Sequence, residues 1–301
     1  MTTIARSFLL LTVIAICAGA VMAQDDGVIS IDSDLVVLNA LIRDTNGRVV
    51  SGLKKELFSV LENGVEQPIS LFSPEETPFA AVILIDTSGS MEQSVSLARS
   101  AAIRFLDGLR PDDHVAIYKF DSKVSLVQDF SNSRDISERI FDIRAYGMTA
   151  LNDAVFKAAE ALRDRPEQRR AIVVLSDGAD NQSSRSSSRA LREAMAANAV
   201  IYTVDMATPT GSQNRRQQNR GALRNFAERT GGQFVAAPGG VAMREAFENI
   251  VKELGEQYTL GYSPLNEKKD GKWREIELRV SRPGLTIRTR KGYTAEKRDK
   301  N

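Results

Sequence analysis

The chain has 301 residues, a formal net charge of +1 at pH 7 and 42% hydrophobic residues, which is enough for one large globular domain or two smaller ones. Its 40 lysine and arginine residues balance 39 aspartate and glutamate residues, so no global field attracts nucleic acid or an anionic membrane. Cys17 is the only cysteine, and this excludes zinc fingers and iron-sulfur sites.

The first residues have the pattern of a secretory signal peptide. Arg6 precedes an apolar stretch over residues 8–20, and Val21 and Ala23 occupy the small-residue positions of a cleavage site. A retained membrane anchor is the less favoured alternative, because the stretch is shorter than the roughly 20 apolar residues that span a bilayer. We expect residues 1–23 to be removed by cleavage after Ala23. The mature chain would then lack cysteine, would not insert stably in a membrane, and would be secreted or held in the periplasm or cell envelope.

Residues 29–75 are predicted to form a small β segment. The runs "DLVVLNALIRD" and "LFSVLENGVEQPISLF" are rich in β-branched and aliphatic residues, and an Asn-Gly turn signal occurs after the first and within the second. A segment of this length is marginal as an independent core. We therefore expect it to pair with strands from elsewhere in the chain.

Residues 78–255 show an alternation of strand-length apolar runs with stretches of helical period, which is typical of a parallel sheet covered on both faces. The runs over residues 81–85 and 171–175 are wholly apolar, as in central strands. The run "KVSLVQDF" alternates instead, which favours an antiparallel edge strand. We also expect a helix over residues 136–144 and a loop in the basic stretch "TPTGSQNRRQQNRG".

Residues 256–295 return to a β pattern. In "WREIELRVS" the apolar side chains largely alternate with charged ones, and "YTLGYSP" and "LTIRTRKGY" lie on either side of it. These strands are candidates to complete the amino-terminal β segment. The predicted fold class is α/β: a doubly wound, mostly parallel sheet with a small β domain built from the two ends of the chain.

Hard oxygen donors gather where the predicted strands end. Asp86, Ser88 and Ser90 follow the first strand of the α/β region, Asp177 follows the strand "AIVVLS", and Thr149 lies in the loop that opens a helix. Loops at the carboxyl ends of parallel strands converge on one crevice. Two carboxylates and three hydroxyls match the ligand preference of Mg²⁺ or Mn²⁺. We therefore predict a divalent metal site with these five residues as ligands.

At these residues the chain resembles the von Willebrand factor type A family. The segments "DTSGSM", "YGMTALNDA" and "LSDG" match the metal-ion-dependent adhesion site of that family at all five positions, and the resemblance covers residues 78–255. It implies a magnesium-binding adhesion module in which an acidic side chain of a protein partner completes the metal shell. With its flanking β segments the chain also resembles an exported bacterial subgroup for which the resemblance implies protein binding.

Other interpretations remain open at this point. Any one of the five residues could instead cap a helix or organise a turn. A metal-dependent phosphoryl-transfer hydrolase would use Asp86 as its nucleophile, but Ser88 stands where such enzymes normally carry a second acid. A scaffold with a purely structural metal would bind partners through its β domain. A Ser-His-Asp triad is disfavoured, because His114, the only histidine, lies at a predicted strand entrance without a GxSxG motif. We favour a binding module that is not an enzyme, because no evident general base accompanies the oxygen cluster.

Overall fold

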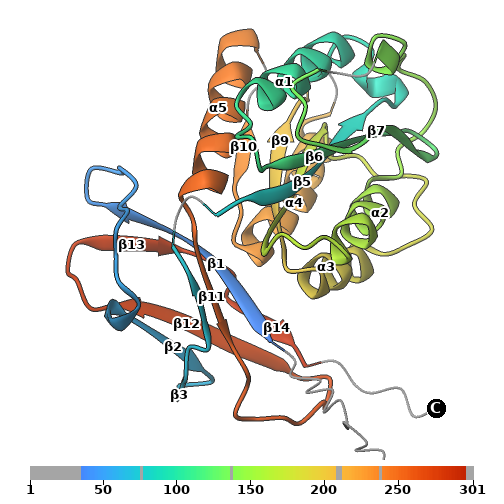
Figure 1. The fold of residues 1–301 in the computed structure, drawn as a ribbon. Coiled ribbons are helices and arrows are strands. Elements are labelled where there is room, and N and C mark those ends of the chain that lie inside the picture. The colour runs from blue at the N-terminus through green and yellow to red at the C-terminus, as the bar shows by residue number, and fades with distance from the viewer. Residues whose placement is uncertain (1–34, 75–76, 136–137, 208–211, 237–238, 296–301) are drawn as a thin grey trace, which may run out of the picture. The chain divides into compact units, whose positions relative to one another are not determined.

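The computed structural model describes residues 35–74, 77–135, 138–207, 212–236 and 239–295. Within these ranges the chain forms an α/β domain and a domain of two β-sheets (Figure 1). The expected signal peptide over residues 1–23 lies outside them. No helix in the described ranges is both long enough and apolar enough to cross a membrane.

The α/β domain contains a six-stranded sheet and five α-helices. Its strands are β5 (Phe79–Asp86), β6 (His114–Phe120), β7 (Val124–Ser131), β8 (Arg169–Ser176), β9 (Ala199–Asp205) and β10 (Phe234–Ala236). Its helices are α1 (Val95–Asp107), α2 (Leu151–Arg163), α3 (Ser187–Ala196), α4 (Gln213–Thr230) and α5 (Gly240–Glu256), with short 3₁₀ helices η2 (Gly89–Met91) and η3 (Glu138–Ile140).

The strand order of this sheet is β10-β9-β8-β5-β6-β7. All neighbouring strands are parallel except β7, which runs antiparallel to β6 at the edge. The predicted fold class and the predicted antiparallel edge strand are therefore confirmed. The order reverses direction beside β5, so β5 and β8 place their carboxyl ends next to each other at the centre of the sheet.

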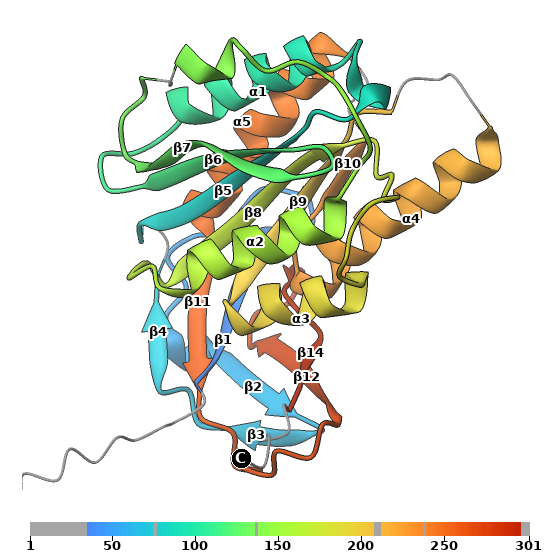
Figure 2. The same ribbon diagram turned by 90° about the vertical axis from the view of Figure 1, so that its right-hand side faces the viewer.

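Both faces of the sheet are covered, as the wholly apolar central strands require. In β5, Ile83 and Ile85 belong to the core beneath α1 and α5, whereas Val82 and Leu84 belong to the core beneath α2, α3 and α4. Figure 2 shows α1 and α5 on one face of the sheet and α2 and α3 on the other. This two-sided burial fixes the strand positions and hence the loops that leave their ends.

The β domain is built from both ends of the described chain. Its first sheet has the order β13-β1-β11-β4 and its second the order β14-β12-β2-β3, with every neighbouring pair antiparallel. The strands are β1 (Val36–Asp44), β2 (Phe58–Glu62), β3 (Val65–Gln67), β4 (Leu71–Ser73), β11 (Tyr258–Tyr262), β12 (Trp273–Val280), β13 (Leu285–Arg288) and β14 (Gly292–Thr294), with a 3₁₀ helix η1 (Lys55–Leu57) before β2. Apolar residues from both sheets form one shared core.

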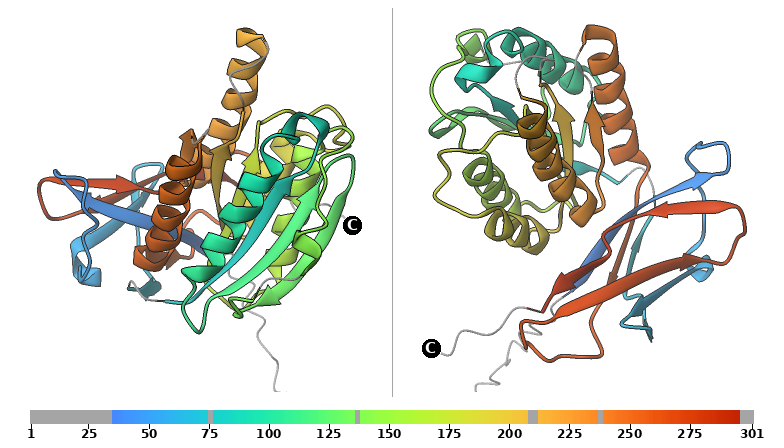
Figure 3. Two further views of the ribbon diagram at one scale, coloured as in Figure 1. Left: turned by 90° about the horizontal axis from the view of Figure 1, so that it is seen from above. Right: turned by 180° about the vertical axis from the view of Figure 1, so that it is seen from behind.

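Two local predictions were wrong. Residues 213–220 form the first half of helix α4 instead of a loop, and Figures 2 and 3 show this half extending away from the sheet. Its residues carry no apolar stripe, because only the second half contacts the core through Leu223, Phe226 and Ala227. A helix was expected over residues 136–144, but the described part of that range, residues 138–144, has only the 3₁₀ helix η3, although Ile140 and Ile143 are buried as a helical pattern would have them.

Candidate functional site

The predicted metal ligands lie at the carboxyl edge of the central sheet. Ile85 of β5 pairs with Leu175 of β8, so Asp86 is level with Ser176, and Asp177 follows one residue further along the neighbouring strand. Ser88 and Ser90 follow in the loop after β5, where Ser90 belongs to η2. Thr149 lies two residues before helix α2. The residues therefore come from three loops that emerge on one edge of the sheet.

Backbone hydrogen bonds connect the Thr149 loop to the loop after β5. The Gly89 amide donates to the Gly147 carbonyl at 3.0 Å, and the Tyr146 amide donates to the Thr87 carbonyl at 2.7 Å. These bonds place the residues just before Thr149 against those between Asp86 and Ser90. The two loops consequently act as one unit.

A second set of bonds connects Thr149 to the loop after β8. The Thr149 amide donates to Asn181 Oδ1 at 2.8 Å, and the Asn181 amide donates back to the Thr149 carbonyl at 3.0 Å. The structure thus brings all three loops together. Among the five side chains themselves, the structure shows a hydrogen bond of 3.2 Å between Ser88 Oγ and Ser90 Oγ.

Asp86 is fully buried and is held at both carboxylate oxygens. Oδ1 accepts the Ser88 amide at 2.9 Å, and Oδ2 accepts the Ser176 hydroxyl at 2.6 Å. Burial raises the pKa of Asp86 to about 7, although the bonds from Ser176 and Ser88 act in the opposite direction and the charge of Asp177 adds to the rise. Asp86 is therefore a fixed carboxylate in an environment that lacks positive charge.

Helix capping does not account for these residues. The N-cap residues of α1 and α2 are Ser94 and Ala150, and neither makes a side-chain cap bond. Ser88 is the N-cap of η2 but its hydroxyl likewise makes no cap bond. Asp177 does organise a turn, because its Oδ1 accepts the Ala179 amide at 3.0 Å. Its second oxygen has no hydrogen-bond partner within the described ranges.

The donor set fits a hard divalent cation. Within the described residues, neither Asp86 nor Asp177 forms an ion pair with a lysine or arginine, so two neighbouring carboxylates have no cationic side chain to balance them. The described part of the chain also contains no group of three or more His, Cys, Asp or Glu side chains suited to a metal. A metal at this edge would therefore depend on the hydroxyls of Ser88, Ser90 and Thr149, and oxygen-only ligation of this kind suits Mg²⁺ or Mn²⁺.

Several supporting residues were not found from the sequence. Ser176 holds Asp86 while its own oxygen accepts the Gly178 amide at 3.0 Å. Asp153 of α2 accepts the Ser184 amide at 2.8 Å and so fixes the loop after β8. Asp180 accepts the Asn152 amide at 3.0 Å at the start of α2. The Ser-Asp pair at the end of β8 was the one local signal that could have identified Ser176.

Two arginines of the basic stretch before residue 221 have different environments: Arg220 forms an ion pair, and Arg215 is exposed. Arg220 Nε lies 2.6 Å from Asp205 Oδ2, and the Asp205 side chain is only 2% exposed. Asp205 ends β9 at the same carboxyl edge as the candidate ligands, but its charge is already neutralised by Arg220. Arg215 is exposed. Of these two arginines, Arg215 alone presents an unpaired charge to solvent in the described structure.

His114 lies at the opposite edge of the sheet from the candidate site. It pairs with Ala80 at the amino end of β5, six residues before Asp86, which corresponds to roughly 20 Å along a strand. Its Nδ1 lies 2.9 Å from Glu167 Oε1. A catalytic triad that combines His114 with Ser88 or Ser90 is therefore geometrically excluded.

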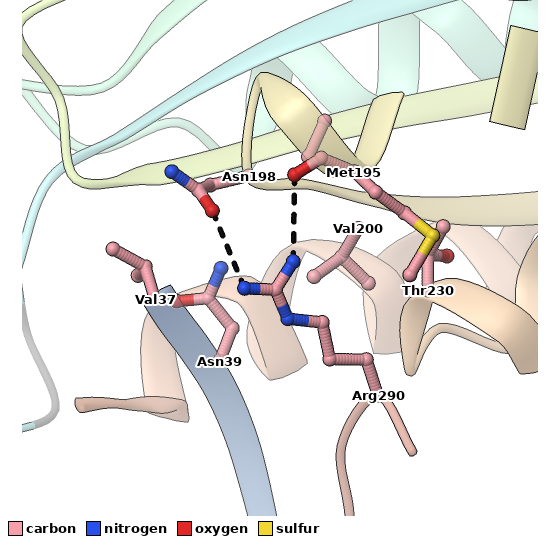
Figure 4. Close-up of a pocket in the computed structure, with 8 residues that line it drawn as sticks. Val37, Asn39, Met195, Asn198, Val200, Thr230 and Arg290 are labelled. Atoms are coloured by element: carbon pink, nitrogen blue, oxygen red, sulfur yellow. Dashed lines mark hydrogen bonds between the residues drawn. The ribbon is translucent and has the colours of Figure 1, made fainter. Parts of the chain in front are cut away.

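A small pocket also lies away from the candidate site (Figure 4). Arg290 projects into it and donates to the Met195 carbonyl at 3.4 Å and to Asn198 Oδ1 at 3.5 Å. Burial lowers the pKa of Arg290 to about 10, while Tyr262 and Tyr293 act in the opposite direction. The pocket contains none of the predicted ligands.

Part of the chain is similar in sequence to known proteins. Residues 81–179 match the model of the von Willebrand factor type A domain, a range that includes all five candidate ligands. The chain is 26% identical over 130 residues to bovine inter-alpha-trypsin inhibitor heavy chain H3, covering 38% of this chain and 15% of that protein. It is 29% identical over 106 residues to the uncharacterized protein sll0103 of Synechocystis, covering 34% of this chain and 25% of that protein.

These alignments span a quarter or less of the two relatives' lengths. Among solved structures, a von Willebrand factor type A protein from Catenulispora acidiphila is similar in fold, with a TM-score of 0.51 and 15% identity over 85% of this chain and 72% of that one. Over residues 81–179 the chain matches the von Willebrand factor type A family, and its fold is similar to that of a solved protein of that family.

Proposed function

We propose that this protein is a protein-binding module that uses a divalent cation, Mg²⁺ or Mn²⁺, to bridge to an acidic side chain of its partner. The observation that carries the proposal is the convergence of two carboxylates and three hydroxyls on three cross-bonded loops, without a cationic side chain among the described residues to balance them. Such a site supplies negative charge that favours a positive ligand.

The five residues would have different roles. Ser88, Ser90 and Thr149 would be neutral ligands, and Asp86 and Asp177 would supply the charge. Ser176 would keep Asp86 in position, since its hydroxyl bond fixes one carboxylate oxygen. A cation bound mainly by neutral oxygens retains affinity for an external carboxylate. An acidic group on the partner would then complete the metal shell.

Binding is better supported than catalysis. A phosphoryl-transfer mechanism needs Asp86 as a nucleophile, but this side chain is buried and hydrogen-bonded at both oxygens. The only histidine lies at the other edge of the sheet. The loops therefore provide ligands, but no evident general base that could activate a nucleophile. We place the module outside the cytoplasm, in agreement with the amino-terminal pattern of a secretory signal.

Calorimetric titration of Mg²⁺ and Mn²⁺ into chelator-treated protein tests the proposal. We expect binding at one site that is lost in Asp86→Ala and in Ser88→Ala. Ser96→Ala is a matched control, because Ser96 is an exposed serine of α1, and it should bind metal as the wild type does. Metal binding that persists in both site variants, or that is absent from the wild type, would contradict the proposed site.

A further inference from the structure

Two large apolar side chains are exposed directly beside the candidate metal site. Tyr146 is 82% exposed and Met148 is 47% exposed, and both lie in the loop that leads to Thr149. The same segment also contains buried residues, since Ile143 is 1% exposed and Ala150 is 2% exposed. The loop is therefore packed against the core on one side and presents Tyr146 and Met148 to solvent on the other.

The backbone of this loop is fixed without help from those two side chains. The Tyr146 amide donates to the Thr87 carbonyl at 2.7 Å, and the Met148 amide donates to Ser122 Oγ at 3.1 Å. Gly147 has a φ of +82°, and a Cβ at this position would lie 3.0 Å from Ser122 Oγ. A glycine and backbone bonds thus set the loop conformation. Neither exposed side chain is needed to hold it.

The position of the two side chains relates them to the candidate ligands. Tyr146 is bonded to Thr87, which stands between Asp86 and Ser88, and Met148 directly precedes Thr149. We refer to Tyr146 and Met148 as the apolar rim. Any partner group that reaches the proposed cation would bring its neighbouring residues over this rim.

We propose that the apolar rim selects protein segments in which an aromatic or aliphatic side chain lies close to the acidic residue that reaches the metal. This inference rests on the proposed function and adds to it the kind of neighbour that the acidic residue must have. Tyrosine gives a large contact area at a low cost in conformational entropy, and methionine adapts to the shape of apolar partners. Burial of such anchors commonly accounts for a tenfold or greater share of affinity.

A displayed peptide library with a fixed central aspartate and random flanking residues tests the proposal. It would be selected on the full-length protein in Mg²⁺, and individual peptides would then be titrated. We expect enrichment of aromatic or aliphatic residues within about three positions of the aspartate, a span that one short extended segment can present to the rim. Binding of these peptides should weaken about tenfold or more in the Tyr146→Ser, Met148→Ser double variant.

Three variants serve as controls. Tyr146→Phe keeps the ring and should restore most of the affinity, whereas Val241→Ser replaces a 65% exposed apolar residue at the start of α5 and should have no effect. The double serine variant should also titrate Mg²⁺ as the wild type does. A loss of metal affinity in it would show that the rim acts on the ion and would overturn the proposal.

The remaining outcomes separate the rim from the proposed function. Metal-dependent peptides without apolar enrichment, or with unchanged affinity for the double serine variant, would overturn the rim and leave the function intact. Peptide binding that survives chelation and Asp86→Ala would overturn both. Self-association of the wild type that is lost in the double serine variant would assign the rim to a second copy of this chain and would also overturn the proposal.

Discussion

Replacement of Ser176 by alanine tests whether a single hydroxyl supports the buried carboxylate at the centre of the site. The Ser176 hydroxyl donates to Asp86 Oδ2 at 2.6 Å and accepts the Gly178 amide at 3.0 Å. A hydrogen bond to a charged group contributes about 1.5–3 kcal/mol, and a buried donor left without a partner adds a further cost. We therefore expect Ser176→Ala to lower the free energy of unfolding by about 2–4 kcal/mol.

Urea unfolding at pH 8 in the presence of a chelator measures this cost. Asp86 is mainly ionised at that pH because its pKa is about 7, and the chelator removes any contribution from bound metal. Ser100→Ala is a suitable control: Ser100 is an exposed serine whose hydroxyl donates to the Ser96 carbonyl at 3.0 Å. We expect this control to change stability by less than about 0.5 kcal/mol.

A double-mutant cycle with Asp86→Asn isolates the interaction with the carboxylate. In that background the partner is neutral, and a neutral hydrogen bond contributes only about 0.5–1.5 kcal/mol. The cost of Ser176→Ala should therefore fall by about 1 kcal/mol or more. An equal cost in both backgrounds, or a cost no greater than that of Ser100→Ala, would refute the assignment of Ser176 as the residue that holds Asp86.

Three further predictions concern the same edge of the sheet. Gly178→Ala should destabilise the protein by about 1–3 kcal/mol in thermal unfolding, because Gly178 has a φ of +80° and an added Cβ would lie 2.5 Å from the Asn219 carbonyl oxygen. Gly221→Ala is the control: an added Cβ there meets no atom within 4 Å, so the change should be neutral or slightly stabilising. Arg220→Ser should lower the free energy of unfolding by about 1–3 kcal/mol, since it leaves the buried Asp205 without its cationic partner. Arg215→Ser should change this free energy little. Equal effects of the two substitutions in urea unfolding would contradict the different roles of the two arginines. Burial tends to raise the pKa of Asp153, but hydrogen bonds from Ser184 and Arg185 outweigh this effect, so the pKa is lowered. The carboxylate therefore stabilises the fold above its unfolded pKa, and this contribution is lost as pH falls through the folded pKa. The stability difference between wild type and Asp153→Asn should shrink below about pH 4, and a difference independent of pH would count against this prediction.

Much of the fold could be predicted because a strand buried on both faces requires a continuous apolar run in the sequence. Residues 81–85 of β5 and 171–175 of β8 are wholly apolar, which places these strands at the centre of a covered sheet. The alternation in β7 follows from its place at the edge. The first half of α4 has no such apolar pattern. Its residues contact no core, so their helical state follows from continuity with the packed half that contains Leu223 and Phe226. Residues 138–143 are the opposite case: Ile140 and Ile143 have helical spacing and are buried, but the backbone forms only a 3₁₀ turn.

The five candidate ligands could be predicted because each lies next to a strand end or a helix start that the apolar pattern locates. The residues that position them could not be predicted, because their partners are distant in sequence. Ser176 and Asp86 are 90 residues apart, and Thr149 is bonded to Asn181 across 32 residues. These bonds form only because strand pairing and loop packing bring distant residues together. The proposed ligands can thus be recognised from local sequence, whereas the residues that hold them in place depend on the tertiary fold. We therefore expect metal affinity to depend as strongly on Ser176 as on several of the proposed ligands.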